Sequence, residues 1–458
     1  MQHETAAQAA AAAVTMDGTF WTATAIFLVA YGVIVSEKVH KTIVALLGAG
    51  LMLVLKVLEQ HEALHVEELG VDWNVVLLLV SMMVIINVMR PTGFFEYIAI
   101  RSAKLGRGEP VRILAIFAVV TAVLSALLDN VTTVLLLAPV TLFVAEALEV
   151  DPIPFLIVEA LASNIGGTAT LIGDPPNIMI ASRARLDFMS FIYHLAPAVI
   201  VMMAVFVPLI KVVFGKALRV RPELRQRVLD MREREAIRDP QLLRKSLFVL
   251  AVVLAGFVFH GVLHFQPATV ALFGAALLLL LSGTHEPHRV LAEVEWPTIF
   301  FFIGLFIIVG GVVKVGLIRW LSVEVLSLTG GDMFAASMLI MWFSAFASAF
   351  VDNIPYVATM NPLVVDMAEQ LWPHLSGTDL LHHSELMPVW WSLALGACLG
   401  GNGTAIGASA NVIIVGMSER AGKRISFARF MAYGMPVMIL TVAISMLYVW
   451  LRYYRLGI

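Results

Sequence analysis

Residues 166–180 read Gly166-Gly167-Thr168-Ala169-Thr170-Leu171-Ile172-Gly173-Asp174-Pro175-Pro176-Asn177-Ile178-Met179-Ile180 and lie inside an apolar run of membrane-spanning length. A continuous helix cannot pass through Pro175-Pro176, because each proline lacks a backbone donor and clashes with the preceding turn. Backbone freed in this way at membrane depth is tolerated only where protein buries it or where it lines a water-filled cavity. The stretch therefore predicts a helix that is broken inside a membrane.

The same pattern returns in the second half of the chain. Residues 400–414 read Gly400-Gly401-Asn402-Gly403-Thr404-Ala405-Ile406-Gly407-Ala408-Ser409-Ala410-Asn411-Val412-Ile413-Ile414 and match the first stretch without a gap, 234 positions later (166 to 400). Paired, interrupted spans in the two halves of one chain are the best sequence indication of a transporter's binding site. We therefore expect the two breaks to meet at one site.

The composition is that of a membrane protein. Hydrophobic residues make up 60% of the 458 residues and charged residues 14%, which excludes an ordinary soluble domain. The net charge of −3 comes without a basic stripe, so we expect no nucleic-acid partner. The single cysteine, Cys398, excludes an intrachain disulfide, and we expect it to be a packed structural thiol. The N-terminal tail, 1–18, has no Lys or Arg, so we expect no cleaved signal peptide and a retained first span.

Apolar segments fall into two series of seven around a polar linker at 215–245. They lie near 20–35, 42–58, 74–90, 111–128, 131–149, 154–180 and 192–214, and then near 246–263, 268–283, 297–313, 333–350, 353–371, 389–416 and 428–451. Asp129-Asn130 and Asp352-Asn353 are 223 positions apart (129 to 352), as are Val71-Asp72-Trp73 and Val294-Glu295-Trp296 (72 to 295). We therefore predict an all-α polytopic membrane protein made of two repeats, 19–214 and 246–458.

Each repeat has an odd number of segments, so the second repeat is expected to enter the membrane in the opposite orientation. Loop charge supports one arrangement: residues 211–245 carry eleven Lys or Arg against five acids, whereas loop 372–388 has neither Lys nor Arg. We therefore expect a cytoplasmic linker and external N- and C-termini in a cell inner membrane. Arg183 and Arg185 would be a mild exception.

Two further elements are expected at the Asp-Asn pairs, where no charged loop separates the apolar arms. We predict re-entrant helical hairpins near 111–149 and 333–371, followed by broken helices at 154–180 and 389–416. The alternative is a single long, kinked span at each pair.

The candidate site combines the two hairpin tips with the two breaks, because polar side chains at membrane depth are costly unless they are paired or hydrated. Half-helix ends offer unpaired N–H groups or carbonyls, glycines let the backbone approach a small solute, and hydroxyls and amides bind it through oxygen or nitrogen. The predicted substrate-binding residues are Asn130, Thr132, Thr133, Gly166, Gly167, Thr170, Asn177, Asn353, Asn402, Gly403, Thr404, Ser409 and Asn411.

Three carboxylates are placed to couple transport to an ion: Asp129, Asp174 and Asp352. Burial favours the protonated form of a carboxyl group and a bound cation favours the ionised form, so proton and cation movements can be linked there. Asp174-Pro175-Pro176 aligns with Ala408-Ser409-Ala410, which leaves the extra charge in the first repeat. We expect no cofactor and no metal site, with the proton as coupling ion and sodium as the alternative.

These motifs resemble the ion transporter superfamily that contains the ArsB arsenite pumps, the NhaD sodium/proton antiporters and the melanosomal P protein. The resemblance is carried by Asp129-Asn130-Val131-Thr132-Thr133, Asn164-Ile165-Gly166-Gly167, Gly173-Asp174-Pro175-Pro176-Asn177, Asp352-Asn353-Ile354-Pro355 and Gly400-Gly401-Asn402-Gly403-Thr404. It implies an inverted-repeat fold with a scaffold domain, a mobile transport domain and elevator-type alternating access, commonly as a homodimer. Related dicarboxylate carriers have serine at the tip position of Asp129 and Asp352, which argues against an anionic substrate here.

The branch that is most similar suggests proton-coupled efflux of arsenite or antimonite, and sodium/proton antiport is the alternative. Arsenite is mostly an uncharged trihydroxide near neutral pH, which suits neutral hydrogen-bonding groups beside a proton-carrying carboxyl group. With one cysteine, capture by several thiolates within one chain is excluded. Either substrate is a small inorganic solute or ion that crosses a lipid bilayer.

Two other features indicate different functions. His61-Glu62-Ala63-Leu64-His65 fits a zinc-protease pattern, which would make the chain an intramembrane metalloprotease, but the motif lies in a short acidic loop and favours a chance match. The Arg-rich stretch 219–245 can serve a cytoplasmic ATPase partner, although an anchor on the cytoplasmic side explains it more simply. No phosphate-binding loop is present, so we expect a secondary transporter and not an enzyme.

Overall fold

The computed structural model describes residues 15–66, 68–215, 218, 220–283 and 286–457, and in this part of the chain every regular element is helical. The all-α class is therefore confirmed. The first repeat contains α2 (Gly18–Ser36), α3 (Lys41–Val54), α4 (Gln60–His65), α5 (Trp73–Met89), η1 (Arg90–Thr92), α6 (Phe94–Leu105), α7 (Pro110–Leu127), α8 (Asn130–Ala147), α9 (Ile153–Gly167), α10 (Pro175–Ala184) and α11 (Phe188–Phe214). Most of the predicted tail, 1–18, lies outside the described residues.

The linker and the second repeat follow in the same order. They contain α12 (Pro222–Asp230), η2 (Glu233–Ala236), α13 (Pro240–Leu263), α14 (Pro267–Ser282), α15 (Pro287–Ala292), α16 (Trp296–Lys314), α17 (Leu317–Thr329), α18 (Met333–Phe350), α19 (Asn353–Leu371), α20 (Gly377–Leu381), α21 (Met387–Gly400), η3 (Gly401–Gly403), α22 (Ser409–Arg420), α23 (Phe427–Val449) and the π-helical η4 (Trp450–Arg455).

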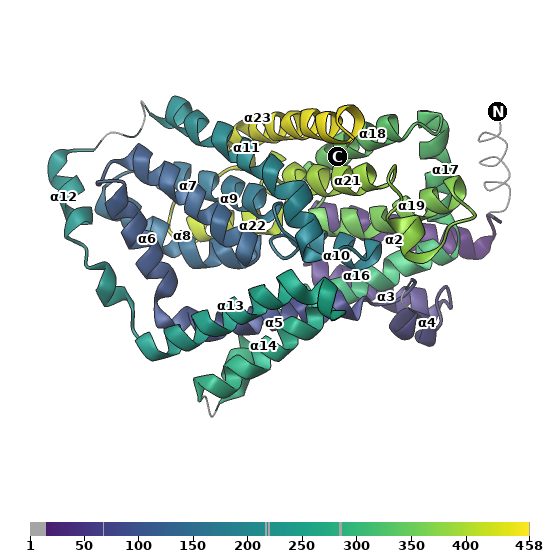
Figure 1. The fold of residues 1–458 in the computed structure, drawn as a ribbon, viewed down its shortest axis with the longest axis horizontal. Coiled ribbons are helices and arrows are strands. Elements are labelled where there is room, and N and C mark those ends of the chain that lie inside the picture. Colours follow the sequence, from purple (N-terminus) through teal and green to yellow (C-terminus); the bar gives the residue numbers. More distant parts are fainter. Residues whose placement is uncertain (1–14, 67, 216–217, 219, 284–285, 458) are drawn as a thin grey trace.

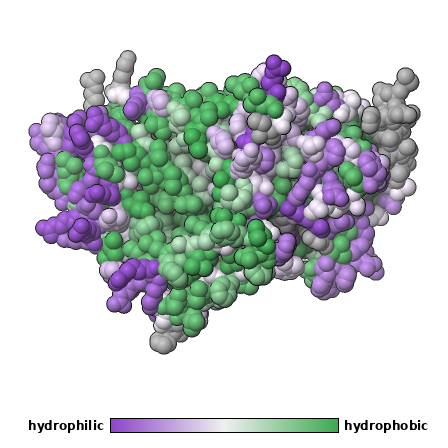
Figure 2. All heavy atoms as spheres, in the orientation of Figure 1, coloured by the Kyte–Doolittle hydropathy of each residue, from purple (hydrophilic) through white to green (hydrophobic). Residues whose placement is uncertain are grey.

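Nine of the helices within the described residues are long and apolar enough to cross a membrane. Apolar residues cover the middle of the face shown in Figure 2, and hydrophilic residues gather toward its left and right ends. An apolar zone between polar ends is the surface that a bilayer requires. The chain is therefore a multi-pass membrane protein.

One group of helices packs side by side and is called the first helix group here. It consists of α2, α3, α5, α13, α14 and α16, in which α3 packs on α16 and α5 on α14. Much of this group lies in the lower part of Figure 1, where α13, α14 and α5 run together. Corresponding helices of the two repeats therefore alternate within this group.

A second helix group contains both hairpins and both broken helices. In each repeat the first hairpin arm packs on the first half of the broken helix, α7 on α9 and α18 on α21. The repeats also cross over, because α22 packs on α8 and α9, and α10 packs on α19 and α21. This crossing brings the two breaks toward each other in the middle of the molecule (Figure 1).

The predicted breaks are present in both repeats. In the first, α9 ends at Gly167 and α10 begins at Pro175, with Asp174 in an extended conformation before it. The double proline occupies the first turn of α10, where a missing N–H costs nothing because no intrahelical partner exists for it. In the second, α21 ends at Gly400 and α22 begins at Ser409, again after an extended residue, Ala408.

Two helices that the sequence did not predict connect the groups. The region between the predicted apolar segments 74–90 and 111–128 contains α6, and α17 occupies the corresponding place after α16. Both are short, at 12 and 13 residues. Each follows a glycine with positive φ, Gly93 before α6 and Gly316 before α17. The left-handed residue redirects the chain from the first group to a hairpin in each repeat.

Candidate functional site

Equivalent hydrogen bonds hold the two breaks against the hairpins. The hydroxyl of Ser125 donates to the carbonyl of Ser163 at 2.6 Å, and the hydroxyl of Ser348, 223 positions later, donates to the carbonyl of Ala397 at 2.7 Å. The carbonyl residues are themselves 234 positions apart (163 to 397). The offsets are those found between the sequence motifs, so the duplicated pattern has a duplicated set of contacts.

The polar residues of the breaks follow the same rule. Thr170 donates its hydroxyl to the carbonyl of Ala126, and Thr404 donates to that of Ala349. The side-chain amide of Asn177 donates to the carbonyl of Thr170 at 2.9 Å, as that of Asn411 does to Thr404 at 2.9 Å. The two threonines therefore satisfy carbonyls at the ends of the first hairpin arms, and the two asparagines satisfy carbonyls that the breaks leave without helical partners.

The predicted glycines are tightly packed, Gly166 and Gly167 against backbone and Gly403 against side chains. A Cβ at Gly166 would lie 2.2 Å from the carbonyl oxygen of Ala122, and one at Gly167 would lie 2.4 Å from that of Gly173. At Gly403 it would lie 2.6 Å from the Cβ of Ala349. In this conformation these glycines permit close contact between the breaks and the hairpins, and a role in binding the substrate stays a prediction.

Buried amides connect the two repeats at the centre of the site. Asn130, at the first hairpin tip, donates to the side-chain oxygen of Asn164 at 3.2 Å. Asn164 donates in turn to the side-chain oxygens of Asn402 and Asn411, both at 3.0 Å. Both tips, in addition, touch the first break, because Asn353 of the second tip donates to the carboxylate of Asp174 at 3.2 Å.

Some buried polar atoms at this centre have no hydrogen-bond partner. They are the side-chain oxygen of Asn130, the hydroxyl of Thr133 and the side-chain nitrogen of Asn402. Unsatisfied buried polar groups are costly and call for an explanation such as a bound ion or water. These buried atoms keep hydrogen-bonding capacity that no protein group uses, and they belong to residues that the sequence analysis had selected.

The tip carboxylates also begin helices. Asp129 accepts from the backbone N–H of Thr132 at 2.8 Å and caps α8, and Asp352 accepts from that of Ile354 at 3.1 Å and caps α19. Both lie at the positive ends of helix dipoles, which stabilise a negative charge. Thr132 therefore contributes its backbone to the first tip.

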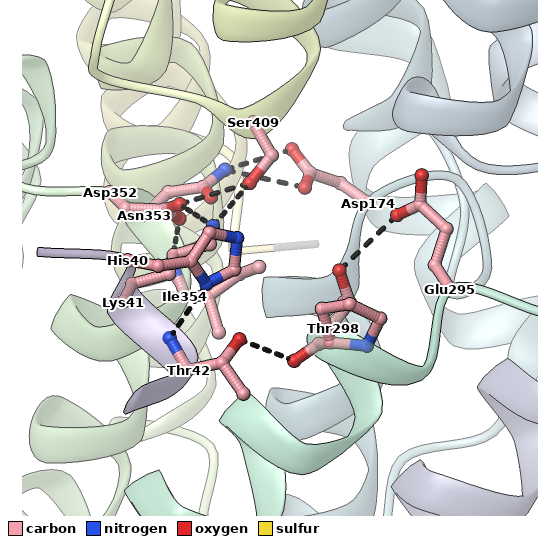
Figure 3. Close-up of polar contacts among 11 residues, drawn as sticks. His40, Lys41, Thr42, Asp174, Glu295, Thr298, Asp352, Asn353, Ile354 and Ser409 are labelled. Carbon is pink, nitrogen blue, oxygen red and sulfur yellow. Dashed lines mark hydrogen bonds and ion pairs between the residues drawn. The ribbon is translucent and has the colours of Figure 1, made fainter. Parts of the chain in front are cut away.

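A cavity of about 500 Å³ opens beside the second tip, between the two helix groups. Its polar lining comes from both: Lys41, Thr42 and Glu295 from the first group, and Asp352 and Ser409 from the second. Figure 3 shows Ser409 beside Asp352 and Asn353, with Lys41 nearby and Glu295 across from them.

The charge of the cavity is dominated by carboxylates. Glu37 lines it as well, and Glu295 accepts from the hydroxyl of Thr298 at 3.2 Å. Burial raises the pKa of Glu295, and the negative charge of Asp129 raises it further. The ammonium of Lys41 forms an ion pair with Asp352 at 2.6 Å, so its positive charge is already compensated. The cavity therefore suits a cation or a neutral solute better than an anion.

Lys41, Glu295 and Asn164 were not among the predicted site residues. Lys41 opens an apolar segment, where a positive charge is typical of a membrane boundary. Glu295 had been noted only as a repeat marker, and Asn164 only as part of a motif. Cys398 was expected to be structural, and it is fully buried, with its thiol 3.4 Å from the side-chain oxygen of Asn177.

The zinc-protease pattern forms the short helix α4, and its groups have other roles. Glu62 caps that helix and accepts from the ammonium of Lys314 at 2.6 Å, an ion pair that lowers its pKa. The rings of His61 and His65 stack on each other. Within the described ranges no group of three or more His, Cys, Asp or Glu is arranged to hold a metal ion.

Two hairpins and two broken helices that meet around buried polar groups, in a chain with nine membrane-length helices among its described residues, define a membrane transporter. Comparison with known proteins gives the family. Residues 31–396 match the CitMHS family, described as "Citrate transporter", and the chain belongs to that family.

Relatives extend over nearly the whole chain. An uncharacterized transporter of Mycobacterium tuberculosis is 48% identical over 434 residues, covering 95% of this chain and 99% of that protein. A 46 kDa membrane protein of Mycobacterium leprae is 46% identical over 93% of this chain and 97% of that protein. The P protein of Mus musculus is 32% identical over 95% of this chain, which corresponds to 60% of that longer protein. The chain is thus a transporter and not an enzyme.

Proposed function

We propose that the protein is a secondary transporter that exchanges protons for a small cation, with sodium as the first candidate, at the site between the hairpin tips and the breaks. The observation that carries the proposal is the ring of carboxylates around one cavity. Asp352, Glu295 and Glu37 line it, and Asp174 lies behind Asn353. Carboxylates that share a low-dielectric site bind protons or cations in competition, which is the requirement for antiport.

Efflux of arsenite or antimonite, the first expectation from the sequence, is the second candidate. The neutral hydrogen-bonding groups favour it, since the buried oxygen of Asn130 and the buried hydroxyl of Thr133 have no protein partner and could bind a trihydroxide that reaches them. Cys398 lies behind the site with no exposed surface, so arsenite would be bound through oxygen and nitrogen atoms. In either case we propose the proton as coupling ion, with no cofactor.

Citrate, which appears in the description of the family, fits this cavity poorly. A tricarboxylate needs several cationic or N–H donors, whereas the cavity offers Lys41, held by Asp352, and His40 among several carboxylates. We therefore propose a cation or a neutral hydroxylated solute in preference to a free organic anion.

We propose that transport uses alternating access of the elevator type. The first helix group would be the scaffold, and the second group would carry the site across the membrane with the linker on the cytoplasmic side and both termini outside. The cavity lies at the start of α3 and α16, on the cytoplasmic side in this orientation, so the conformation described would be inward-facing. The homodimer that the resemblance implies is a proposal, and a mass measurement in detergent tests it.

The charge of the linker gives little support to an ATPase partner. Three of the linker's arginines are paired with carboxylates of the same chain: Arg227 with Glu149, Arg232 with Glu235 and Arg238 with Glu96. These pairs reduce the free positive charge that a partner would find. We therefore propose transport driven by an ion gradient alone.

The test is flux in proteoliposomes or inverted vesicles under an imposed proton gradient, with sodium and arsenite compared. Asp129→Asn and Asp352→Asn should each abolish proton-coupled flux and leave a folded protein, because asparagine also caps helices. Asp332→Asn is the matched control, since Asp332 caps α18 at the base of the same hairpin, away from the cavity. Wild-type flux in both tip variants would remove these carboxylates from the mechanism.

Equal, proton-independent responses to sodium and arsenite would contradict both candidates. A proton-coupled response to arsenite without one to sodium would select the second candidate over the first.

A further inference from the structure

Lys41 forms a bridge between the two helix groups. Its ammonium lies 2.6 Å from Oδ2 of Asp352 and 2.8 Å from the hydroxyl of Ser409. Ser409 donates in turn to the same carboxylate oxygen at 3.0 Å. Figure 3 shows the three side chains converging, with Lys41 coming from α3, Asp352 from the second hairpin tip and Ser409 from the start of α22.

The position of Lys41 is unfavourable for its own helix. Lys41 is the first residue of α3, where the helix dipole is positive and repels a cation. Its ammonium also lies 4.9 Å from the ring centroid of Phe301 on α16, so part of its water is replaced by protein. The side chain keeps 27% of its surface exposed and that of Asp352 keeps 10%. The dipole of its own helix opposes this charge, and the carboxylate of the second group compensates it.

The bridge leaves Asp352 with no carboxylate oxygen unoccupied. Oδ1 accepts from the backbone N–H of Ile354, and Oδ2 accepts from Lys41 and Ser409. The titratable groups that face the bridge from the surrounding elements are Glu37 and His40 before α3 and Glu295 before α16, with Asp174 behind Asn353. A cation or proton that enters the cavity therefore competes with the ammonium for Oδ2 of Asp352.

We infer that Lys41 is a tethered competitor for a cation-binding site formed by the Asp352 carboxylate and the Ser409 hydroxyl. When the site holds no transported cation, the ammonium fills it and fastens the second helix group to the first. A proton neutralises Asp352, or a small cation takes the place of the ammonium as its counter-ion, and the fastening is released. The inference rests on the proposed function in taking Asp352 as the exchange site.

The arrangement has a consequence for coupling. Suppose that the second group could move while Asp352 is ionised and has no cation bound. A negative charge would then cross the membrane without its ion, and the ion gradient would be dissipated. Because Lys41 belongs to the first group, it binds that charge only in this conformation. The empty site is therefore held on one side, and the loaded site is free to move.

The test measures the distance between the groups directly. Nitroxide labels at Lys38→Cys and Lys423→Cys, two exposed positions in the loops before α3 and after α22, report the separation in nanodiscs, in a Cys398→Ala background. At neutral pH and without sodium, the labelled protein with Lys41 intact should give one dominant distance between the two nitroxides. Lys41→Met should raise the population of a second distance by about tenfold, as expected for the loss of a charge-assisted hydrogen bond. Sodium or acid added to the protein with Lys41 intact should have the same effect.

Lys314→Met is the matched control. The ammonium of Lys314 also lies 2.6 Å from a carboxylate oxygen, that of Glu62, but both residues belong to the first group and its immediate surroundings. This variant should keep the original distance. Lys41→Gln serves if Lys41→Met is not monodisperse after purification.

Identical distance distributions with and without Lys41 would overturn the inference, and so would a distribution that ignores both sodium and acid. Failure of the proposed function is seen separately, as an absence of proton-coupled flux in proteoliposomes of the unlabelled protein. A shift in Lys41→Met that sodium or acid reproduces would support the bridge whichever solute the flux assay identifies.

Discussion

The side-chain nitrogen of Asn164 donates to the side-chain oxygen of Asn411 at 3.0 Å, and this bond ties the broken helix of the first repeat to that of the second. Asn164→Ala removes it together with the equivalent bond to Asn402 and the bond that Asn164 accepts from Asn130. Three buried polar groups would lose a partner, at a cost of about 1–3 kcal/mol each. We expect a lower midpoint of thermal unfolding in detergent, and loss of flux because the breaks are no longer held together.

Asn361→Ala is the control for that variant. Asn361 is also a buried asparagine, on the second hairpin arm, but its side-chain oxygen has no hydrogen-bond partner to lose. It should change the unfolding midpoint much less. Equal destabilisation by the two variants would mean that the amide cluster contributes nothing beyond ordinary packing.

Gly173 and Gly407 are predicted to tolerate no side chain. A Cβ at Gly173 would lie 2.5 Å from the carbonyl oxygen of Gly167, and one at Gly407 would lie 2.8 Å from that of Gly401. Backbone on both sides must shift to accept a methyl group, so each Gly→Ala variant should lose about 1–3 kcal/mol or more. Gly416→Ala, on α22, is the control because its nearest neighbouring atom lies 4.0 Å away. The measurement is the midpoint of thermal unfolding of the three variants. A Gly173→Ala protein as stable as the original would show that the breaks are packed less tightly than in this structure.

Glu295 is predicted to make the stability of the protein depend on pH. Its pKa in the folded protein is raised by burial and by Asp129 above the ordinary value of 4.5, so the folded state holds the proton more tightly than the unfolded state. Its contribution to stability is therefore fully present below pH 4.5 and is lost as the pH rises through the folded pKa. Glu295→Gln should reduce the pH dependence of the midpoint of thermal unfolding across that range.

Glu293→Gln provides the comparison for Glu295, because Glu293 is an exposed glutamate two residues earlier on the same segment. It should leave the pH profile of the midpoint unchanged. A profile that responds equally to both variants would assign the effect to general surface charge.

Features with a local chemical cause could be predicted from the sequence. The break before α10 follows from Pro175-Pro176, and the hairpin tips follow from short polar pairs between apolar arms. The second break has no proline, and it was found only because residues 400–414 repeat residues 166–180. Duplication therefore supplied the information that the local sequence lacked.

Features that depend on distant pairing could not be predicted. Lys41 and Asp352 are 311 residues apart, and neither has a neighbour in the sequence that indicates the other. The same holds for Asn164, whose partners Asn402 and Asn411 lie in the other repeat. The helix α6 was missed for a different reason: at 12 residues with Glu96, Arg101 and Lys104, it has the composition of a charged loop.

Cys398 offers a test of how an arsenic compound would bind. It occupies the position that corresponds to Asn164 in the first repeat (164 to 398), and it has no exposed surface. Cys398→Ala removes the protein's one thiol together with weak contacts to Asn177 and Asp174, so it should cost little stability. We expect unchanged flux in this variant and no reaction of the native protein with a thiol-specific maleimide until it is unfolded. Loss of arsenite flux in Cys398→Ala, with sodium flux retained, would instead mean that the thiol reaches the solute during transport, since an oxygen-bound trihydroxide would not depend on it.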